Sequence, residues 1–194
     1  VLIPKLSSAG ERNVSSSALQ LTLGLALPAS VGLTLLAAPI VALLFEHGAF
    51  TARDTQETAL ALTILAASLP AFALARPMGA ALFAREQMAP PMIATLAGLA
   101  ATIAAALLIQ PAHGHAGVAA AISLGAWVTT ISLGGALAAR GELALDAQGW
   151  RNIAMIVVAS VLMAATVLAA ATRIAPETED NVWARALALG TLIG

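Results

Sequence analysis

The stretch that decides the fold is LQLTLGLALPASVGLTLLAAPIVALLF, which runs from Leu19 to Phe45 without a charged residue. A helix rises about 1.5 Å per residue, so about 20 predominantly apolar residues can cross roughly 30 Å of hydrocarbon. Its apolar residues are not confined to one face, which is typical of a helix surrounded by lipid and other helices. The stretch therefore predicts a membrane-spanning helix.

More stretches of this kind follow, and none of them alternates polar and apolar residues as the strands of a membrane barrel would. We expect an all-α fold, a polytopic transmembrane bundle in a single membrane domain over residues 1–194. The expected spans are approximately 19–45, 58–84, 91–109, 117–139 and 153–172, and a sixth at 182–194 is only about half as long as a span needs. Both ends of the sequence therefore look like cuts within a longer polypeptide.

The amino-acid composition excludes several classes of function. Hydrophobic residues make up 60% of the sequence and charged residues 10%, against about 25% charged in a typical soluble domain. The net charge is −1 and the nine Lys and Arg residues are scattered, so we expect no nucleic-acid partner. There is no cysteine, which excludes disulfides and thiol nucleophiles.

The sequence contains no recognisable catalytic motif. Neither HExxH, GxSxG nor a Gly-rich phosphate loop occurs. His113 and His115 lie in the predicted loop QPAHGHAG, but two imidazoles without a third ligand make a poor zinc site. We therefore expect no enzyme activity, no metal and no cofactor.

The connection LFEHGAFTARDT after the first span carries helix-start signals. Thr51 and Asp54 have the spacing of a capping box, Gly48 suits a turn with positive φ, and Phe50 can pack against the start of the next helix. Most polar residues of this connection thus have a structural explanation.

Small residues and prolines occur inside the spans. Small residues four apart allow close approach of two helices, and prolines remove a backbone hydrogen bond and tend to kink a helix. The small pairs are Ala26 with Ser30, Ala94 with Gly98 and Gly125 with Thr129, and the prolines are Pro28, Pro39 and Pro70.

Basic residues favour one side of the membrane. Six of them lie toward one side and three toward the other, so the positive-inside rule favours the first side as cytoplasmic. The six are Lys5, Arg12, Arg76, Arg85, Arg140 and Arg151, and the three are Arg53, Arg173 and Arg185.

Arg76 is the best candidate for binding an anionic headgroup. It lies next to Pro77 inside an apolar stretch, where an unpaired cation costs about 2.5–3.5 kcal/mol on insertion scales. Two explanations remain open: the side chain reaches the cytoplasmic interface, or it faces a wet cavity. Arg85 is the second candidate, although with Glu86 it also fits a solvated ion pair.

Several segments together resemble the MviN/MurJ family of bacterial lipid II flippases, part of the superfamily of multidrug and polysaccharide exporters. LIPKLS at Leu2–Ser7 looks like the end of the family's eighth helix, and Leu27–Thr55 is similar to its ninth helix and exit loop. The stretch ARPMGAALFAREQMAPP is similar to another segment of the family, in which Lys usually occupies the position of Arg76. GHAG at Gly114–Gly117 is similar to the start of the twelfth helix. Shared residues are Phe83, Ala84, Arg85, Pro91, Ser123 and Trp127, and departures are Ala80, Gln87 and Thr129.

The resemblance implies the second half of a fourteen-helix transporter. Such a protein flips lipid-linked peptidoglycan precursor across the bacterial cytoplasmic (inner) membrane by alternating access. Membrane lipids, and cell-wall synthesis proteins, are the other partners implied. The family's essential arginines lie upstream of this chain, and its last two helices hold the lipid tail, which is in keeping with the uncharged stretch Ile153–Thr172.

Two alternatives stay open. A related drug or polysaccharide-intermediate exporter would use the same scaffold with other cavity residues. A non-transporting membrane scaffold in cell-wall synthesis would need no cavity at all.

Overall fold

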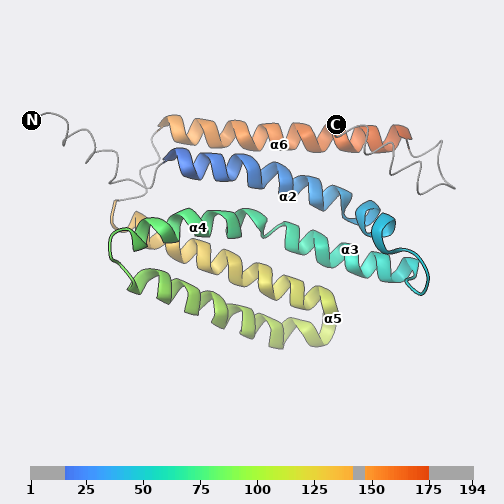
Figure 1. Cartoon of the computed structure of the whole chain (residues 1–194), viewed down its shortest axis with the longest axis horizontal. Coiled ribbons are helices and arrows are strands. Elements are labelled where there is room, and N and C mark those ends of the chain that lie inside the picture. Colours follow the sequence, from blue (N-terminus) through green and yellow to red (C-terminus); the bar gives the residue numbers. More distant parts are fainter. Residues whose placement is uncertain (1–15, 142–146, 175–194) are drawn as a thin grey trace, which may run out of the picture.

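The computed structural model describes residues 16–141 and 147–174. Within them the chain folds into helices joined by short connections (Figure 1). The helices are α2 (Ser16–Phe45), α3 (Ala52–Ala66), α4 (Leu69–Phe83), α5 (Ala89–Ala138) and α6 (Ala147–Ile174). The all-α transmembrane fold class expected from the sequence is confirmed.

Five segments are long and apolar enough to cross a membrane. They are Ala18–Phe45, Ala52–Phe83, Ala89–Pro111, Gly114–Ala138 and Gly149–Ala169. Each corresponds to one of the five full-length stretches recognised in the sequence. The sixth stretch, 182–194, and the segment before Ser16 lie outside the described residues.

The helices lie side by side in the order α6, α2, α3–α4 and α5 (Figure 1). The α3–α4 pair packs against α5 on one side and against α2 on the other, and α6 packs on α2. Two small apolar clusters hold this arrangement. One gathers Leu19, Met78, Leu82, Ala94, Leu133 and Leu137, and the other Ala37, Val41 and Ala59.

The second span is not one uninterrupted helix over 58–84. Its helix begins at Ala52 instead of 58, because the Thr51–Asp54 capping box starts it: the Thr51 N–H donates to Asp54 Oδ2 over 2.8 Å and the Asp54 N–H donates to Thr51 Oγ1 over 3.4 Å. The span is also interrupted at Ala67–Ser68, just before Pro70. This interruption, hereafter the α3–α4 break, confirms the disruption expected at Pro70, whereas α2 continues through Pro28 and Pro39.

The third and fourth spans form a tight hairpin instead of two helices joined by a loop. Helical backbone continues through the predicted loop QPAHGHAG, except that Gly114 has φ 52° and ψ −126°. A side chain disfavours this conformation, so glycine allows the chain to reverse within one residue. The two arms of α5, Ala89–Pro111 and Gly114–Ala138, therefore run antiparallel.

Glycines let the two arms approach closely. A Cβ added to Gly98 would lie 2.8 Å from Gly125 O, and one added to Gly125 would lie 2.7 Å from Gly98 O. Both distances are too short for any real side chain, so the helices cross where neither has one. The predicted close approach at Ala94–Gly98 and Gly125–Thr129 is confirmed.

Candidate functional site

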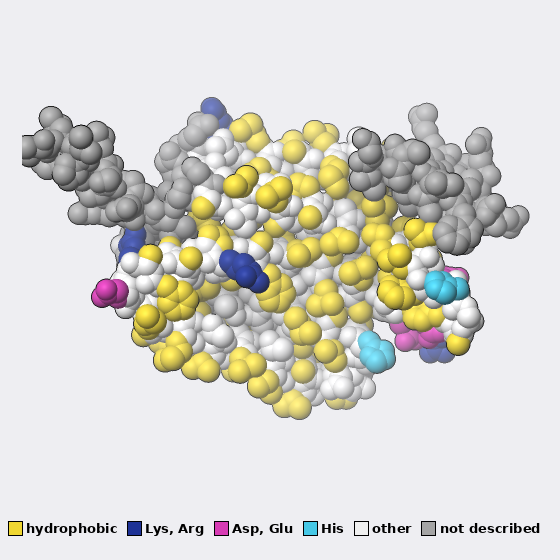
Figure 2. Space-filling view, viewed as in Figure 1, with side chains coloured by type: hydrophobic (Ala, Val, Ile, Leu, Met, Phe, Trp, Pro, Cys, Tyr) yellow, Lys and Arg dark blue, Asp and Glu magenta, His cyan; other side chains and the backbone are white. Residues whose placement is uncertain are grey.

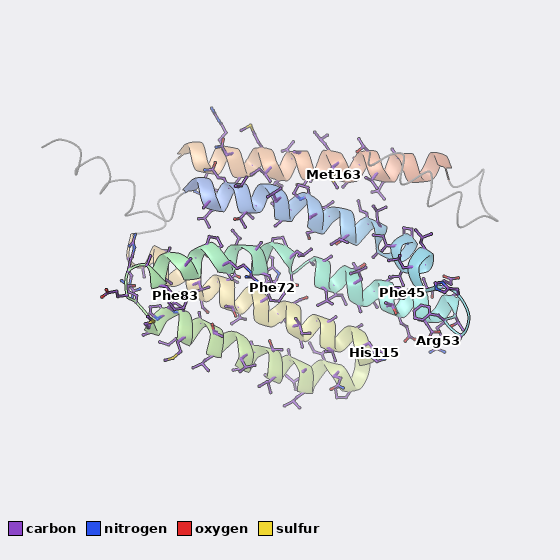
Figure 3. All side chains as sticks on the ribbon, in the orientation of Figure 1. Phe45, Arg53, Phe72, Phe83, His115 and Met163 are labelled. Atoms are coloured by element: carbon purple, nitrogen blue, oxygen red, sulfur yellow. The ribbon has the colours of Figure 1, made fainter. Side chains whose placement is uncertain are left out.

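Charged residues gather at the two ends of the bundle (Figure 2). At one end, the connection between α2 and α3 carries Glu46, and the first turns of α3 carry Arg53, Asp54 and Glu57. At the other end, Arg85 and Glu86 follow α4, and Arg140 follows α5. Figure 3 shows Phe45, Arg53 and His115 at the first end and Phe83 at the other. The two ends are called below the acidic end and the basic end.

Side chains tie together the connections at each end. At the acidic end Thr55 Oγ1 donates to Glu46 Oε2 over 2.8 Å, and Arg53 Nε lies 3.2 Å from Glu57 Oε1. At the basic end Arg140 Nη1 donates to Gln87 Oε1, which joins the turn after α4 to the end of α5. Capping left Glu46, His47 and Arg53 of this connection unexplained. The bond from Thr55 shows that Glu46 closes the connection onto α3.

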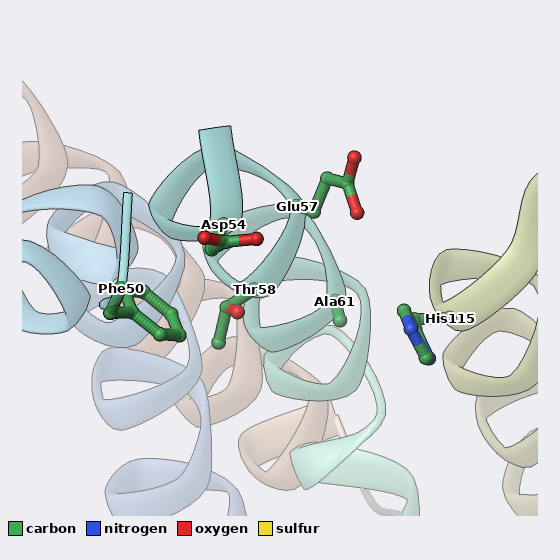
Figure 4. A pocket seen from close by; sticks show the side chains of 6 residues that line it. All are labelled: Phe50, Asp54, Glu57, Thr58, Ala61 and His115. Atoms are coloured by element: carbon green, nitrogen blue, oxygen red, sulfur yellow. The ribbon is translucent and has the colours of Figure 1, made fainter. Parts of the chain in front are cut away.

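A shallow pocket opens at the acidic end (Figure 4). It has a volume of about 350 Å³ and lies between the first turns of α3 and the bend of α5. The lining residues are Phe50, Asp54, Glu57, Thr58, Ala61 and His115. In the described part of the chain no three His, Cys, Asp or Glu side chains gather closely enough to hold a metal ion. The residues that line the pocket therefore do not identify a ligand.

Arg76 is the middle residue of α4 and is exposed. No ion pair or hydrogen bond joins its guanidinium to another described residue. Since Arg76 precedes Phe83 by about two helical turns, it lies roughly 10 Å inside the end of the helix.

Arg85 is separate from Arg76. It follows the end of α4, is half-buried, and its N–H donates to Leu82 O over 3.2 Å. At about 1.5 Å per residue, the rise from Arg76 to Phe83, the last residue of α4, is roughly 10 Å, and Arg85 lies in the turn that follows. The structure therefore places the two arginines at different depths and does not bring them together in one site.

The α3–α4 break has a polar network that sequence reasoning did not find. Successive carbonyls before the break accept hydrogen bonds from hydroxyls: Ser123 Oγ donates to Ile64 O over 2.8 Å, Ser68 Oγ to Leu65 O over 2.6 Å, and Ser30 Oγ to Ala66 O over 2.7 Å. Beyond the break, Thr130 Oγ1 donates to Ala71 O over 2.7 Å. The available signal was Pro70, whose missing N–H leaves Ala66 O without its helical donor.

Known proteins of similar sequence and structure agree with this architecture. The family model described as lipid II flippase MurJ matches residues 1–193. The chain is 33% identical over 171 residues to the probable lipid II flippase MurJ of Rhizobium meliloti (strain 1021), covering 84% of this chain and 32% of that protein. It is 33% identical over 151 residues to the corresponding protein of Rhizobium tropici, covering 78% and 28%.

A solved structure shares the fold. The inward closed conformation of lipid II flippase MurJ superposes with a TM-score of 0.75 at 23% identity, covering 92% of this chain and 36% of that one. The chain thus spans about a third of the length of the proteins it matches. Five apolar helical spans and a family match over nearly every residue lead to one assignment: the chain belongs to the MurJ family of lipid II flippases.

Proposed function

We propose that this chain is the C-terminal part of a flippase that carries lipid-linked peptidoglycan precursor across the bacterial cytoplasmic membrane by alternating access. The observation that carries the proposal is the family match over residues 1–193, together with a likeness to a solved MurJ fold. Lipid II flippase is the name that the relatives carry. The partners of the whole protein are then the precursor, the surrounding membrane lipids and proteins of cell-wall synthesis.

Moving a lipid-linked precursor requires binding and release, with no covalent change in the substrate. The chain therefore acts as part of a transporter and not as an enzyme. Its part is to supply one portion of the wall of a translocation path, because relatives are about three times as long as the region that they share with it. Faces exposed here include those that meet the remaining helices.

Arg76 is the residue that we place on the translocation path. A pyrophosphate-linked headgroup is anionic, and a guanidinium binds phosphate oxygens through two parallel hydrogen bonds. Arg76 supports this role because it is exposed at the depth of a membrane-spanning helix and has no protein anion beside it in the described residues. Arg85 lies nearer the membrane surface, where it would attract the headgroup before it enters.

Complementation tests the proposed function. The full-length gene is expressed in cells depleted of their lipid II flippase, and growth and peptidoglycan synthesis are measured. We expect both to be restored. If a well-expressed and correctly inserted protein fails to restore them, the substrate assignment is wrong, and export of a drug or of another polysaccharide intermediate is tested next. A scaffold would restore neither kind of transport.

A further inference from the structure

The α3–α4 break lies in the middle of a membrane-spanning segment. Ser68 is near the centre of Ala52–Phe83 and only 1% exposed. Its partners also lie well inside their spans, Ser30 within Ala18–Phe45 and Ser123 within Gly114–Ala138. Water is scarce at this depth, and an unsatisfied backbone carbonyl costs several kcal/mol in hydrocarbon. A break here persists only if other groups supply the missing donors.

Two carbonyls before the break have lost their usual donor for an identifiable reason. The Ser68 N–H donates to Leu65 O over 3.0 Å, one residue short of the helical partner, so Ile64 O is left for Ser123. Pro70 has no N–H, so Ala66 O is left for Ser30. Hydroxyl groups from neighbouring helices thus replace the bonds that the break removes.

The second arm of α5 spans both sides of the break. Ser123 donates to Ile64 O and Thr130 donates to Ala71 O, and both pairs have a sequence separation of 59. Ser123 and Thr130 are therefore two turns apart on one face of a helix that runs parallel to α3 and α4. Because this arm is uninterrupted and bonds to both helices, it fixes the end of α3 and the first turn of α4 relative to each other.

We propose that Ser30, Ser123 and Thr130 are positioning residues whose hydroxyls hold the α3–α4 break and so set the direction of α4 and the place of Arg76. Arg76 lies roughly 12 Å beyond Ser68 along the helix. A rotation of about 10° at the break therefore moves its Cα by about 2 Å. The consequence for transport rests on the proposed function, whereas the geometry of the break does not.

Spin-label distances in the full-length protein test the proposal. Labels are introduced in a cysteine-free full-length protein at two exposed sites across the break, Gln56→Cys and Ala80→Cys. A reference pair lies within the straight arm, Val118→Cys and Ile131→Cys. A rotation of about 10° at the break moves the Ala80 label sideways by roughly 3 Å. In the Ser123→Ala/Thr130→Val variant we therefore expect the distance distribution across the break to shift or broaden, with the reference pair unchanged.

Matched controls remove a hydroxyl that serves its own helix. Ser160 is 3% exposed and donates to Ile156 O over 2.8 Å, and Thr95 donates to Pro91 O over 2.8 Å. Ser160→Ala and Thr95→Val should leave the distribution across the break as in the parent protein. An equal shift in these controls would overturn the proposal, as would an unchanged distribution in a folded Ser123→Ala/Thr130→Val variant.

Pro70→Ala supplies a rescue. It restores the N–H that Ala66 O lacks, so Ser30 becomes dispensable. We expect Ser30→Ala to broaden the distribution across the break in the parent and to have little effect in the Pro70→Ala background. Equal effects in both backgrounds contradict the proposal. If the double hydroxyl variant fails to fold, the single Ser30→Ala and Thr130→Val variants give the same readout.

The transport arm separates this inference from the proposed function. If the parent gene fails to complement, the substrate assignment falls while the spin-label result stands. If the parent complements and the distance shifts in Thr130→Val, we expect precursor flipping to fall by roughly tenfold with membrane insertion unchanged. Normal flipping despite a shifted α4 would show that its direction does not matter for transport.

Discussion

Gly98 and Gly125 fix how closely the two arms of α5 can approach, because each would place a Cβ within 2.8 Å of the other's carbonyl oxygen. The crowding atoms are backbone carbonyl oxygens, which cannot move away as the end of a flexible side chain can. The spacing of small residues indicated that close packing was possible here. It could not show that the two pairs meet each other, since that depends on the reversal at Gly114.

Gly125→Ala should destabilise the bundle by about 1–3 kcal/mol, since its new methyl group presses on the Gly98 carbonyl. Gly135→Ala on the same arm is the control. A Cβ there meets nothing within 4 Å, so this change should be neutral or gain about 0.5–1 kcal/mol from the better helix former. Thermal unfolding of the full-length protein in detergent measures both, and equal stabilities would contradict the crowding.

Arg76→Ala should reduce precursor transport while leaving the protein inserted. A hydrogen bond to a charged group contributes about 1.5–3 kcal/mol, so the expected loss is roughly ten- to hundredfold. Arg76→Lys keeps the charge and should retain part of the activity. Flipping in vesicles is the assay, and Arg53→Ala, at the acidic end, is the control. Full transport by an inserted Arg76→Ala protein would mean that the arginine only reaches for the interface.

The α3–α4 pair shows where sequence reasoning reached its limit. Apolar length predicted the span, and Thr51 with Asp54 predicted a helix start, yet the break at Ala67–Ser68 was foreseen only as a disturbance at Pro70. Its bonds come from Ser30 and from residues 59 positions away on α5. A hydroxyl in an apolar stretch is compatible with bonding its own helix, as Ser160 does, so only the packed structure identifies those that cross.

Thr51→Ala should loosen the first turn of α3 without changing the rest of the helix. The substitution removes the hydroxyl oxygen that accepts the Asp54 N–H, and loss of such a cap costs about 1 kcal/mol. Hydrogen exchange of the amides in this turn should become faster by about fivefold. Gln56→Ala on the exposed face of α3 serves as the comparison, and faster exchange in both proteins would rule out a specific capping effect.

The whole molecule has one end rich in carboxylates and another that carries Arg85 and Arg140, and all five spans run between them. The number of full-length spans and their approximate places followed from the sequence because apolar length specifies them, but the capping box moved the start of the second span from 58 to Ala52. Candidate binding residues were harder: Arg76 and Arg85 stood out as charges, but their separation along α4 depends on the turn that ends the helix. Their role stays a prediction.

The basic end should face the cytoplasm. Single cysteines at exposed positions of the two ends, Ala84→Cys and His47→Cys, test this orientation in a cysteine-free full-length protein. A thiol reagent that cannot cross membranes should label His47→Cys from the periplasmic side and should reach Ala84→Cys only after the inner membrane is opened. The reverse pattern would invert the topology and would place Arg85 on the periplasmic side.

The seam between α2 and α6 joins parts of the chain that the ribosome makes at very different times. Asn152 Nδ2 donates to Gln20 Oε1 over 2.8 Å across a separation of 132 residues, and Met163 and Ile156 lie against Gly32 and Gly24. At about 5–20 residues per second, synthesis from one partner to the other takes roughly 7–26 s. The α5 hairpin can close as soon as its arms emerge. The face of α2 that carries Gly24 and Gly32, in contrast, has no partner helix until α6 has been translated.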